Sequence, residues 1–314
     1  MGSETVHRLP VIEFTDKNTN PETESWSETC KKVVDALEQY GCFVAVYDKL
    51  TQEIHTQLLE SLQTLFSLPT ETKIQNKSSK ALHGYEGQKP YFPLSESMSI
   101  ADAHTVQGVR DFSNVMWPNG NPTFCENLFA YTKLAAELER IVVRMVFESY
   151  GVGKHHESYV GSANYLCRVM RYREPEIGEK KMAFMPHTDK SFMSTIHQNN
   201  VAGLEVKAKD GEWFGLPGLT FSSVVVMAGD AIMAWTNDRI ISPIHRVTME
   251  GSEARYTLAQ FSVMEKDMVK APDEFVDEDH PLRYKPFDHL KFLDFFSQEE
   301  NRMLESPIHT YCGV

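Results

Sequence analysis

The 314-residue sequence lacks most features of a secreted, membrane-spanning or zinc-cluster protein. It has five cysteines, an odd number with no C-x-x-C pair, which disfavours both a disulfide framework and a cysteine zinc site. No apolar run approaches the roughly 18 residues that a membrane-spanning helix needs. The N-terminus shows no basic segment followed by an apolar one, so we expect no secretory signal. These absences predict a cytoplasmic protein with reduced thiols.

Positive charge is also scarce in this chain. Lys and Arg number 31 against 44 Asp and Glu, which gives a formal net charge of −13 at pH 7. That charge repels nucleic acids and anionic membranes, so we expect neither as a partner. The apolar fraction of 41% and the charged fraction of 24% are ordinary for a globular protein with its own core. The expected partner is therefore a small molecule.

Residues 1–160 are predicted to form a helical region with short strands. The apolar runs at 9–14 and 42–47 indicate strands, and helical spacing indicates helices over 54–66 and 122–150. Ser25 and Glu28 form an S-x-x-E capping box for a helix over 26–40. Residues 73–120 show no clear period and are predicted to be a long irregular segment. Its Tyr91 and Phe92 either line a pocket or pin the segment to the body.

Residues 161–266 change to short β-like runs, at 164–172, 191–197, 203–208, 223–227, 231–235, 245–249 and 256–262. Asp210–Gly211 between two of them is a hairpin signal. Strands at this spacing predict a mainly β fold with packed helices, as a sandwich or jelly-roll barrel whose strand ends surround a cavity. Residues 267–314 are predicted to be a helical tail that packs on this core, with an amphipathic helix over 287–303.

His187, Asp189 and His245 are the candidate catalytic residues and metal ligands. They stand in P-H-T-D-K-S and P-I-H-R-V-T. Two imidazoles and one carboxylate fill one face of an octahedral metal, the ligand set of non-haem Fe(II) sites that handle dioxygen. His187 and Asp189 are two residues apart, so on a strand both side chains point the same way. His245 lies far along the chain and must come from a second strand that folds back beside them. H-x-D triplets also arise by chance, but the three residues fall together in one β-rich region.

Two further groups of residues surround this triplet in the sequence. Arg255, ten residues after His245, offers a planar charged fork that suits a carboxylate co-substrate. Apolar residues near the ligands are candidate substrate contacts, although core packing explains each of them equally well. They are Phe184, Met185, Phe192, Trp235 and Phe261, and together they suit an apolar or aromatic molecule.

The motifs resemble those of the plant 2-oxoglutarate- and Fe(II)-dependent dioxygenases over nearly the whole chain. The resemblance is carried by L-P-V-I-E-F, E-Q-Y-G-C-F-V-A-V, P-H-T-D-K-S, A-G-D-A and the I-H-R-V to A-R-Y-T segment. H-G-Y-E-G-Q-K-P, S-E-S-M-S-I and M-W-P-N-G-N-P resemble the AOP-like branch. That branch includes alkenyl-producing glucosinolate enzymes, deoxypodophyllotoxin synthase and steroidal glycoalkaloid hydroxylases.

The resemblance implies a double-stranded β-helix core, a monomer, and Fe(II) and 2-oxoglutarate as cofactor and co-substrate. His187, Asp189 and His245 match the iron ligands, and Arg255, Thr257 and Tyr172 match residues that bind the distal carboxylate of 2-oxoglutarate. Met170 stands where the family has asparagine, which leaves the co-substrate contacts on that side open. Ascorbate is expected to stimulate such an enzyme.

The expected reaction follows from this resemblance. A plant specialised metabolite would be hydroxylated, desaturated or cyclised, with 2-oxoglutarate converted to succinate and CO2. Three other functions are also compatible with the sequence. They are a same-fold oxidase that uses ascorbate instead of 2-oxoglutarate, a zinc hydrolase, and a non-catalytic small-molecule sensor.

Overall fold

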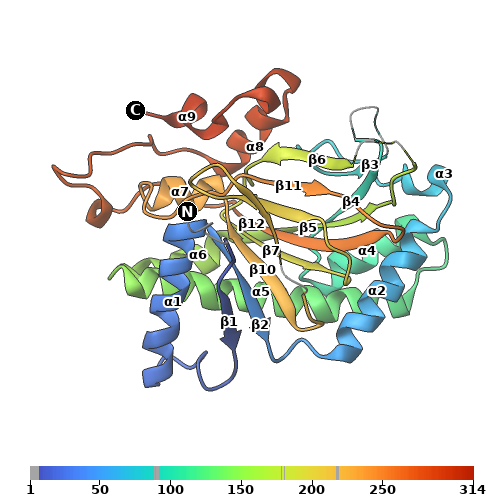
Figure 1. Ribbon diagram of the computed structural model, residues 1–314, viewed down its shortest axis with the longest axis horizontal. Helices are drawn as coiled ribbons and strands as arrows, with labels where there is room; N and C mark the ends of the chain where they lie inside the picture. The colour runs from blue at the N-terminus through green and yellow to red at the C-terminus, as the bar shows by residue number, and fades with distance from the viewer. Residues whose placement is uncertain (1–6, 88, 90–91, 178, 180, 217–218) are drawn as a thin grey trace, which may run out of the picture.

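The computed structural model describes residues 7–314 apart from 88, 90–91, 178, 180 and 217–218, and within them the strands form two sheets (Figure 1). The long sheet contains, in spatial order, β1 (Val11–Phe14), β2 (Cys42–Tyr47), β10 (Ser223–Ala228), β7 (Met193–Gln198), β12 (Arg255–Met264), β5 (Ala163–Tyr172), β4 (Ser95–Ala101) and β3 (Tyr85–Glu86). The short sheet contains β6 (Met182–His187), β11 (His245–Thr248), β8 (Leu204–Lys207) and β9 (Trp213–Gly215). The predicted mainly β architecture with packed helices is confirmed.

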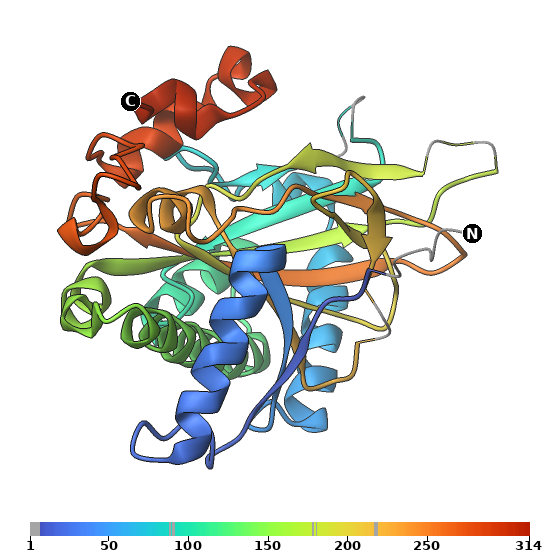
Figure 2. The same ribbon diagram turned by 60° about the vertical axis from the view of Figure 1, so that its left-hand side comes forward.

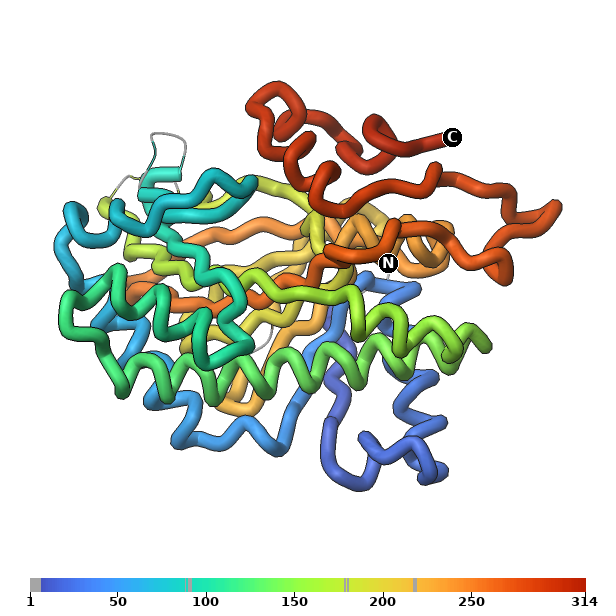
Figure 3. The backbone as a smooth tube through the Cα atoms, turned by 180° about the vertical axis from the view of Figure 1, so that it is seen from behind, coloured from blue at the N-terminus to red at the C-terminus, as the bar shows by residue number. Residues whose placement is uncertain are grey.

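Helices cover the outer face of the long sheet, and the C-terminal segment lies above the short sheet (Figures 1 and 2). The first group contains α1 (Glu24–Tyr40), α2 (Gln52–Phe66), α3 (Thr70–Lys73), α4 (Val106–Met116), α5 (Pro122–Ser149), η1 (Gly153–His155) and α6 (His156–Ser162). The later elements are α7 (Asp230–Trp235), η2 (Asp273–Phe275), α8 (His289–Ser297), η3 (Glu299–Met303) and α9 (Pro307–Cys312). Seen from behind, α5 runs along the long sheet (Figure 3). None of the helices in the described part of the chain has the length and apolarity to span a bilayer.

Two hydrophobic clusters result, one on each face of the long sheet. Strand residues alternate between the faces. On β5, Cys167 and Val169 join the cluster under the helices, whereas Met170 and Tyr172 belong to the cluster between the two sheets. Strands β1 to β4, from the predicted N-terminal region, pair into the same long sheet as the β core. The division of the chain at residues 160 and 266 stays a prediction.

Helix α1 begins earlier than the predicted capping box requires. Thr23 is the N-cap, and its hydroxyl accepts from the backbone N–H of Trp26, whereas Ser25 donates to the carbonyl of Lys17. The helix ends at Gly41, whose φ of 70° is a left-handed conformation that favours glycine. A β-carbon at Gly41 would lie 2.6 Å from the Pro243 ring, so the helix end packs tightly against the segment before His245.

The prediction of an irregular segment over 73–120 was wrong, because it contains β3, β4 and α4. Strand β4 is S-E-S-M-S-I-A, and its Ser95, Ser97 and Ser99 are buried. Buried serines remove the alternation of apolar and polar residues by which a strand is recognised in a sequence. The hairpin at Asp210–Gly211 is confirmed, because β8 and β9 pair antiparallel around it.

Two apolar runs adopt another structure than predicted. A-I-M-A-W, expected as a strand, forms α7, and a short apolar run does not distinguish strand from buried helix. A β-carbon at Gly229, just before α7, would lie 2.0 Å from the Ser191 carbonyl, so this approach requires glycine. The predicted helix over 287–303 is divided into α8 and η3. Its apolar residues are not all buried, because Leu290 is exposed.

His197 on β7 is a buried histidine in the helix-covered face of the long sheet. Its Nδ1 donates to the Ser223 carbonyl at 2.9 Å, so its Nε2 accepts from Nδ1 of His55 at 2.9 Å. Its ring also stacks on Tyr131. Burial lowers the pKa of His197 to about 4, so the folded protein keeps this ring neutral where an unfolded chain binds a proton.

This difference predicts a loss of stability in acid. A histidine that is protonated only in the unfolded chain makes unfolding more favourable as the pH falls below about 6.5. Between pH 7 and pH 5, His197 alone should cost about 2 kcal/mol of unfolding free energy. Urea unfolding of the wild type and of His197→Asn at both pH values measures this cost. An equal acid loss in the two proteins would contradict the assignment.

Candidate metal centre

Three ligand atoms converge where β6 and β11 meet. The pairing of these antiparallel strands places His187 directly opposite His245. Nε2 of His187 lies 3.7 Å and Nε2 of His245 lies 3.6 Å from Oδ1 of Asp189. One donor atom from each of the three residues lies within 4.8 Å of the others, so all three fit around one metal ion. Asp189 comes from the loop after β6, not from the strand itself.

Neighbouring groups orient each ligand toward that shared point. Nδ1 of His187 donates to the Met185 carbonyl at 2.9 Å, and Nδ1 of His245 donates to the Pro243 carbonyl at 3.2 Å. A carbonyl only accepts, so each Nδ1 carries the proton and each Nε2 keeps a lone pair for a metal. Burial, followed by the neighbouring His245, lowers the pKa of His187 to about 3, which keeps its ring neutral.

Several supporting residues were missed by the sequence prediction. The Ser194 hydroxyl donates to Oδ2 of Asp189 at 2.6 Å and leaves Oδ1 free for the metal. Lys190 donates to Asp230 at 2.6 Å, and the Asp230 N–H donates to the Asp189 carbonyl at 2.8 Å. Ser194 and Gln198, which contacts Arg255, could have been found from the sequence. They are an even number of residues apart on β7, and alternate residues of a strand share one face. Lys190 and Asp230 stand in the motifs P-H-T-D-K-S and A-G-D-A, but no periodicity indicates that they contact each other.

Arg255 is buried at the far end of the space between the sheets. It is 1% exposed, donates to Oε1 of Gln198 at 2.7 Å, and lies 5.2 Å from the Tyr172 ring centre. Burial lowers the pKa of Arg255 to about 10. Among the described residues, its Nε and the buried Thr257 hydroxyl find no hydrogen-bond partner. A buried guanidinium and a buried hydroxyl that still need hydrogen-bond partners can bind the carboxylate of a dicarboxylic acid such as 2-oxoglutarate.

Met170 lies beside this anchor. On β5 it pairs with Thr257, and the Tyr172 hydroxyl donates to its sulfur at 3.3 Å. Thr257 in turn pairs with Gln198 on β7, the residue that contacts Arg255. The amide of Gln198 therefore supplies polar contact on the side opposite Met170, where the sequence left the compensating residue open.

Four of the expected substrate residues lie at or near the metal centre or between the sheets. Phe184 lies 4.7 Å from the His187 ring and stacks on Phe92 at 4.8 Å. Met185 is exposed, and Phe261 packs on the cluster between the sheets, where it pairs with Ser194. Tyr91 lies outside the described residues. The aromatic pair forms a wall beside His187.

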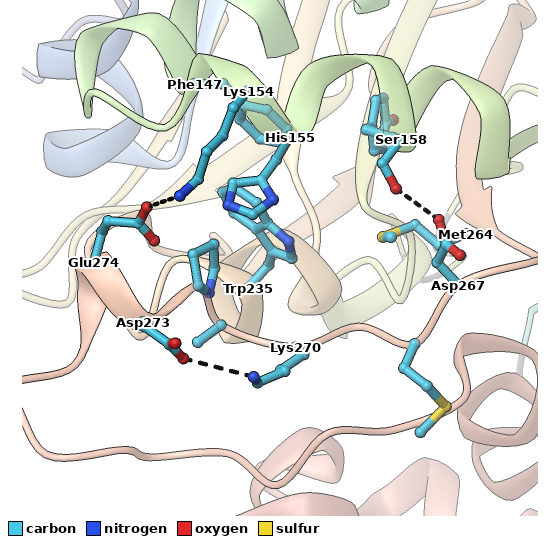
Figure 4. A pocket seen from close by; sticks show the side chains of 14 residues that line it. Phe147, Lys154, His155, Ser158, Trp235, Met264, Asp267, Lys270, Asp273 and Glu274 are labelled. Atoms are coloured by element: carbon cyan, nitrogen blue, oxygen red, sulfur yellow. Dashed lines mark hydrogen bonds and ion pairs between the residues drawn. The ribbon is translucent and has the colours of Figure 1, made fainter.

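Phe192 and Trp235 lie instead in the cluster under the helices. Phe192 is 0% and Trp235 5% exposed, and both pack against Phe147 of α5. Trp235 borders a surface pocket of about 270 Å³, whose described lining residues include none of the three ligands (Figure 4). The predicted substrate contact is corrected for both residues, because the long sheet separates this cluster from the space between the sheets.

Comparison with known proteins agrees with this geometry. Residues 163–263 match the 2OG-Fe(II) oxygenase superfamily, and residues 9–121 match the non-haem dioxygenase in morphine synthesis N-terminal family. The probable 2-oxoglutarate-dependent dioxygenase AOP1.2 of Arabidopsis thaliana is 39% identical, over 98% of this chain and 96% of its own. The chain belongs to the 2OG-Fe(II) oxygenase superfamily. It is a 2-oxoglutarate-dependent dioxygenase of the AOP-like branch, with Fe(II) as its metal.

More distant relatives of this oxygenase align along nearly the whole chain or share its fold. AOP3 of Arabidopsis thaliana is 28% identical over 98% of both chains. The crystal structure of the dioxygenase for auxin oxidation in rice superposes with a TM-score of 0.82 at 24% identity, over 98% of this chain and all of that one. JOX2, solved with 2OG, Fe and JA, gives 0.77 at 20% identity, over 93% and 86%. Both solved structures confirm the fold.

Loss of a ligand should abolish turnover and metal binding together. We expect His187→Ala and Asp189→Ala to lower turnover by well over 100-fold, because even residues that only support a metal ligand contribute 10–100-fold. Succinate release and metal content after dialysis measure the two effects, and circular dichroism checks the fold. Asp210→Ala, at the exposed β8–β9 turn, is the control. Full activity in either ligand variant would remove the iron assignment.

Arg255→Gln should specifically weaken 2-oxoglutarate binding. Charge-assisted hydrogen bonds contribute about 2–3 kcal/mol, so the KM for 2-oxoglutarate should rise about 30- to 100-fold. Arg246→Gln is the matched control, because Arg246 follows ligand His245 but pairs with Glu205 at 2.7 Å. Initial-rate measurements over a range of 2-oxoglutarate concentrations give both KM values. Equal shifts in the two variants would argue against a carboxylate at Arg255.

Proposed function

We propose that this dioxygenase oxidises an apolar or aromatic plant specialised metabolite by hydroxylation, desaturation or ring closure, and releases succinate and CO2. The observation that carries the substrate class is the stack of Phe92 on Phe184, which in turn contacts the ring of ligand His187. A flat apolar face beside an open metal position favours a substrate with an aromatic or apolar body.

Each group of residues has a separate task in this proposal. His187, Asp189 and His245 hold the metal on one face, while Arg255 and Thr257 hold the distal carboxylate of 2-oxoglutarate. Fe(II) with bound 2-oxoglutarate supplies the oxidative decarboxylation that is coupled to oxidation of a C–H bond. Phe92 and Phe184 position the substrate and exclude water from the reacting carbon. Met185 and Phe261 are proposed as further contacts.

Two kinds of relative support a small-molecule substrate. The AOP relatives come from a plant and are described as 2-oxoglutarate-dependent dioxygenases. Of the structural neighbours, one is a dioxygenase for auxin oxidation and another was solved with JA. Nε of buried Arg255 has no hydrogen-bond partner in the described part of the chain, which favours 2-oxoglutarate over the alternative in which ascorbate replaces it. We propose ascorbate as a stimulant only.

The surroundings of the enzyme are part of the same proposal. A net charge of −13 disfavours nucleic acid as a partner. The five cysteines are free, which suits a reducing compartment such as the cytoplasm. We propose that the enzyme is a cytoplasmic monomer. Light scattering of the purified protein tests the oligomeric state.

A metabolite screen tests the reaction. The enzyme with Fe(II), 2-oxoglutarate and ascorbate is incubated with a library of plant metabolites. We expect at least one compound to gain an oxygen atom or lose two hydrogens by mass spectrometry, with succinate formed in equal amount. The Asp189→Ala protein is the control. Product formation without 2-oxoglutarate would favour the ascorbate-dependent alternative, and no 2-oxoglutarate decarboxylation with any compound would favour a non-catalytic binder.

A further inference from the structure

Arg168 on β5 is an inward-facing cation that the assigned roles do not use. Met170 and Tyr172 on the same strand face the space between the sheets. Arg168 is two residues before Met170, so it shares that face. Its direct neighbours across the sheet are Ala259 on β12 and Ser99 on β4. Burial raises the pKa of Tyr172, whereas the charges of Arg255 and Arg168 lower it, so both cations lie near that ring.

The present partners of Arg168 are mostly neutral. Its guanidinium donates to the Ser97 hydroxyl at 2.9 Å and to the Leu82 carbonyl. A Glu86 oxygen lies 3.4 Å away, which is long for a charge-assisted hydrogen bond. Only 15% of the Arg168 side chain is exposed. A buried guanidinium held this loosely by a carboxylate has unused capacity for an anion.

Glu86 is itself shared between several cations. Lys89 donates to its other oxygen at 3.2 Å. Burial alone would raise the pKa of Glu86, but Arg168, Lys89 and Arg302 of η3 together lower it. Glu86 therefore keeps a cationic partner if an incoming anion takes its place on Arg168. Glu86 and Lys89 stand in H-G-Y-E-G-Q-K-P, and Ser97 stands in S-E-S-M-S-I. The iron and 2-oxoglutarate sites assign no role to these two motifs.

The polar groups on β3, β4 and β5 and the aromatic pair at β6 border the same hydrophobic cluster between the sheets. Met170, beside Arg168 on β5, and Phe184 on β6 pack on the same cluster between the sheets. Figure 1 shows β6 passing over the region of β3 and β4. Phe92 follows β3 in the chain and stacks on Phe184, so one segment contributes Glu86 to the polar groups and Phe92 to the aromatic pair. A molecule that reaches both groups would contact aromatic rings with one part and the Arg168 guanidinium with another.

We infer that Arg168 is the substrate-recognition residue of this enzyme, and that the substrate carries a carboxylate on its apolar or aromatic body. The carboxylate replaces Glu86 on the guanidinium fork, while the body lies against Phe92 and Phe184. This assignment rests on the proposed function, because it places the substrate of that reaction. It narrows the substrate class from apolar molecules in general to lipophilic acids.

The test compares aromatic carboxylic acids with their methyl esters. Anaerobic calorimetry on the enzyme with Fe(II) and 2-oxoglutarate measures binding, and succinate release in air measures turnover. We expect at least one acid to bind about 10- to 100-fold more tightly than its ester. Arg168→Gln should abolish this preference while the KM for 2-oxoglutarate stays within about twofold. Arg171→Gln, on the opposite face of β5, is the matched control.

Glu86→Gln separates recognition from a merely structural role. Removing the competing carboxylate should tighten acid binding about tenfold, whereas loss of a structural ion pair would weaken it or leave it unchanged. The inference is overturned if no acid binds, if acids and esters bind alike, or if Glu86→Gln weakens acid binding or leaves it unchanged. Acid-selective, Arg168-dependent binding without any turnover would support the recognition role and overturn the proposed reaction instead.

Discussion

The antiparallel pairing of β6 with β11 is the constraint on which the site depends. It sets His187 opposite His245, and the loop after β6 then has only two residues in which to bring Asp189 to the same point. The carbonyls of Met185 and Pro243 fix the tautomers of the two rings. Since a shift of one residue turns strand side chains to the other face, the register of this pair is also the geometry of the metal centre.

The space between the sheets is organised by charge as well as by shape. Arg255 pairs with Tyr172 at the end of β5, and Arg168 lies four residues earlier on that strand. The carboxylate of Asp189 lies at the metal centre, beside His187 and His245. Buried cations without strong anionic partners are costly for the free protein, and the cost is recovered when an anion binds. An interior of this kind selects its ligands by where their negative groups lie.

The sequence identified the reaction centre better than the elements around it. His187, Asp189, His245 and Arg255 are reactive or charged types in fixed motifs, so their chemistry is visible without a structure. Strand β4 and helix α7 were missed, because buried serines hide a strand and a short apolar run fits a buried helix equally well. The position of Trp235 depends on contacts between segments that are distant in the sequence, and so does the pairing of Lys190 with Asp230 that supports Asp189. No local sequence pattern contains such contacts.

The close approach of Gly41 to Pro243 connects the end of the N-terminal helix with the segment that orients ligand His245. Gly41 ends α1, and Pro243, two residues before ligand His245, packs against the α-carbon of Gly41. Any side chain at position 41 would push that proline and, with it, the carbonyl that orients the imidazole. A substitution at the end of α1, far from the catalytic motifs in the sequence, would therefore also disturb the metal centre.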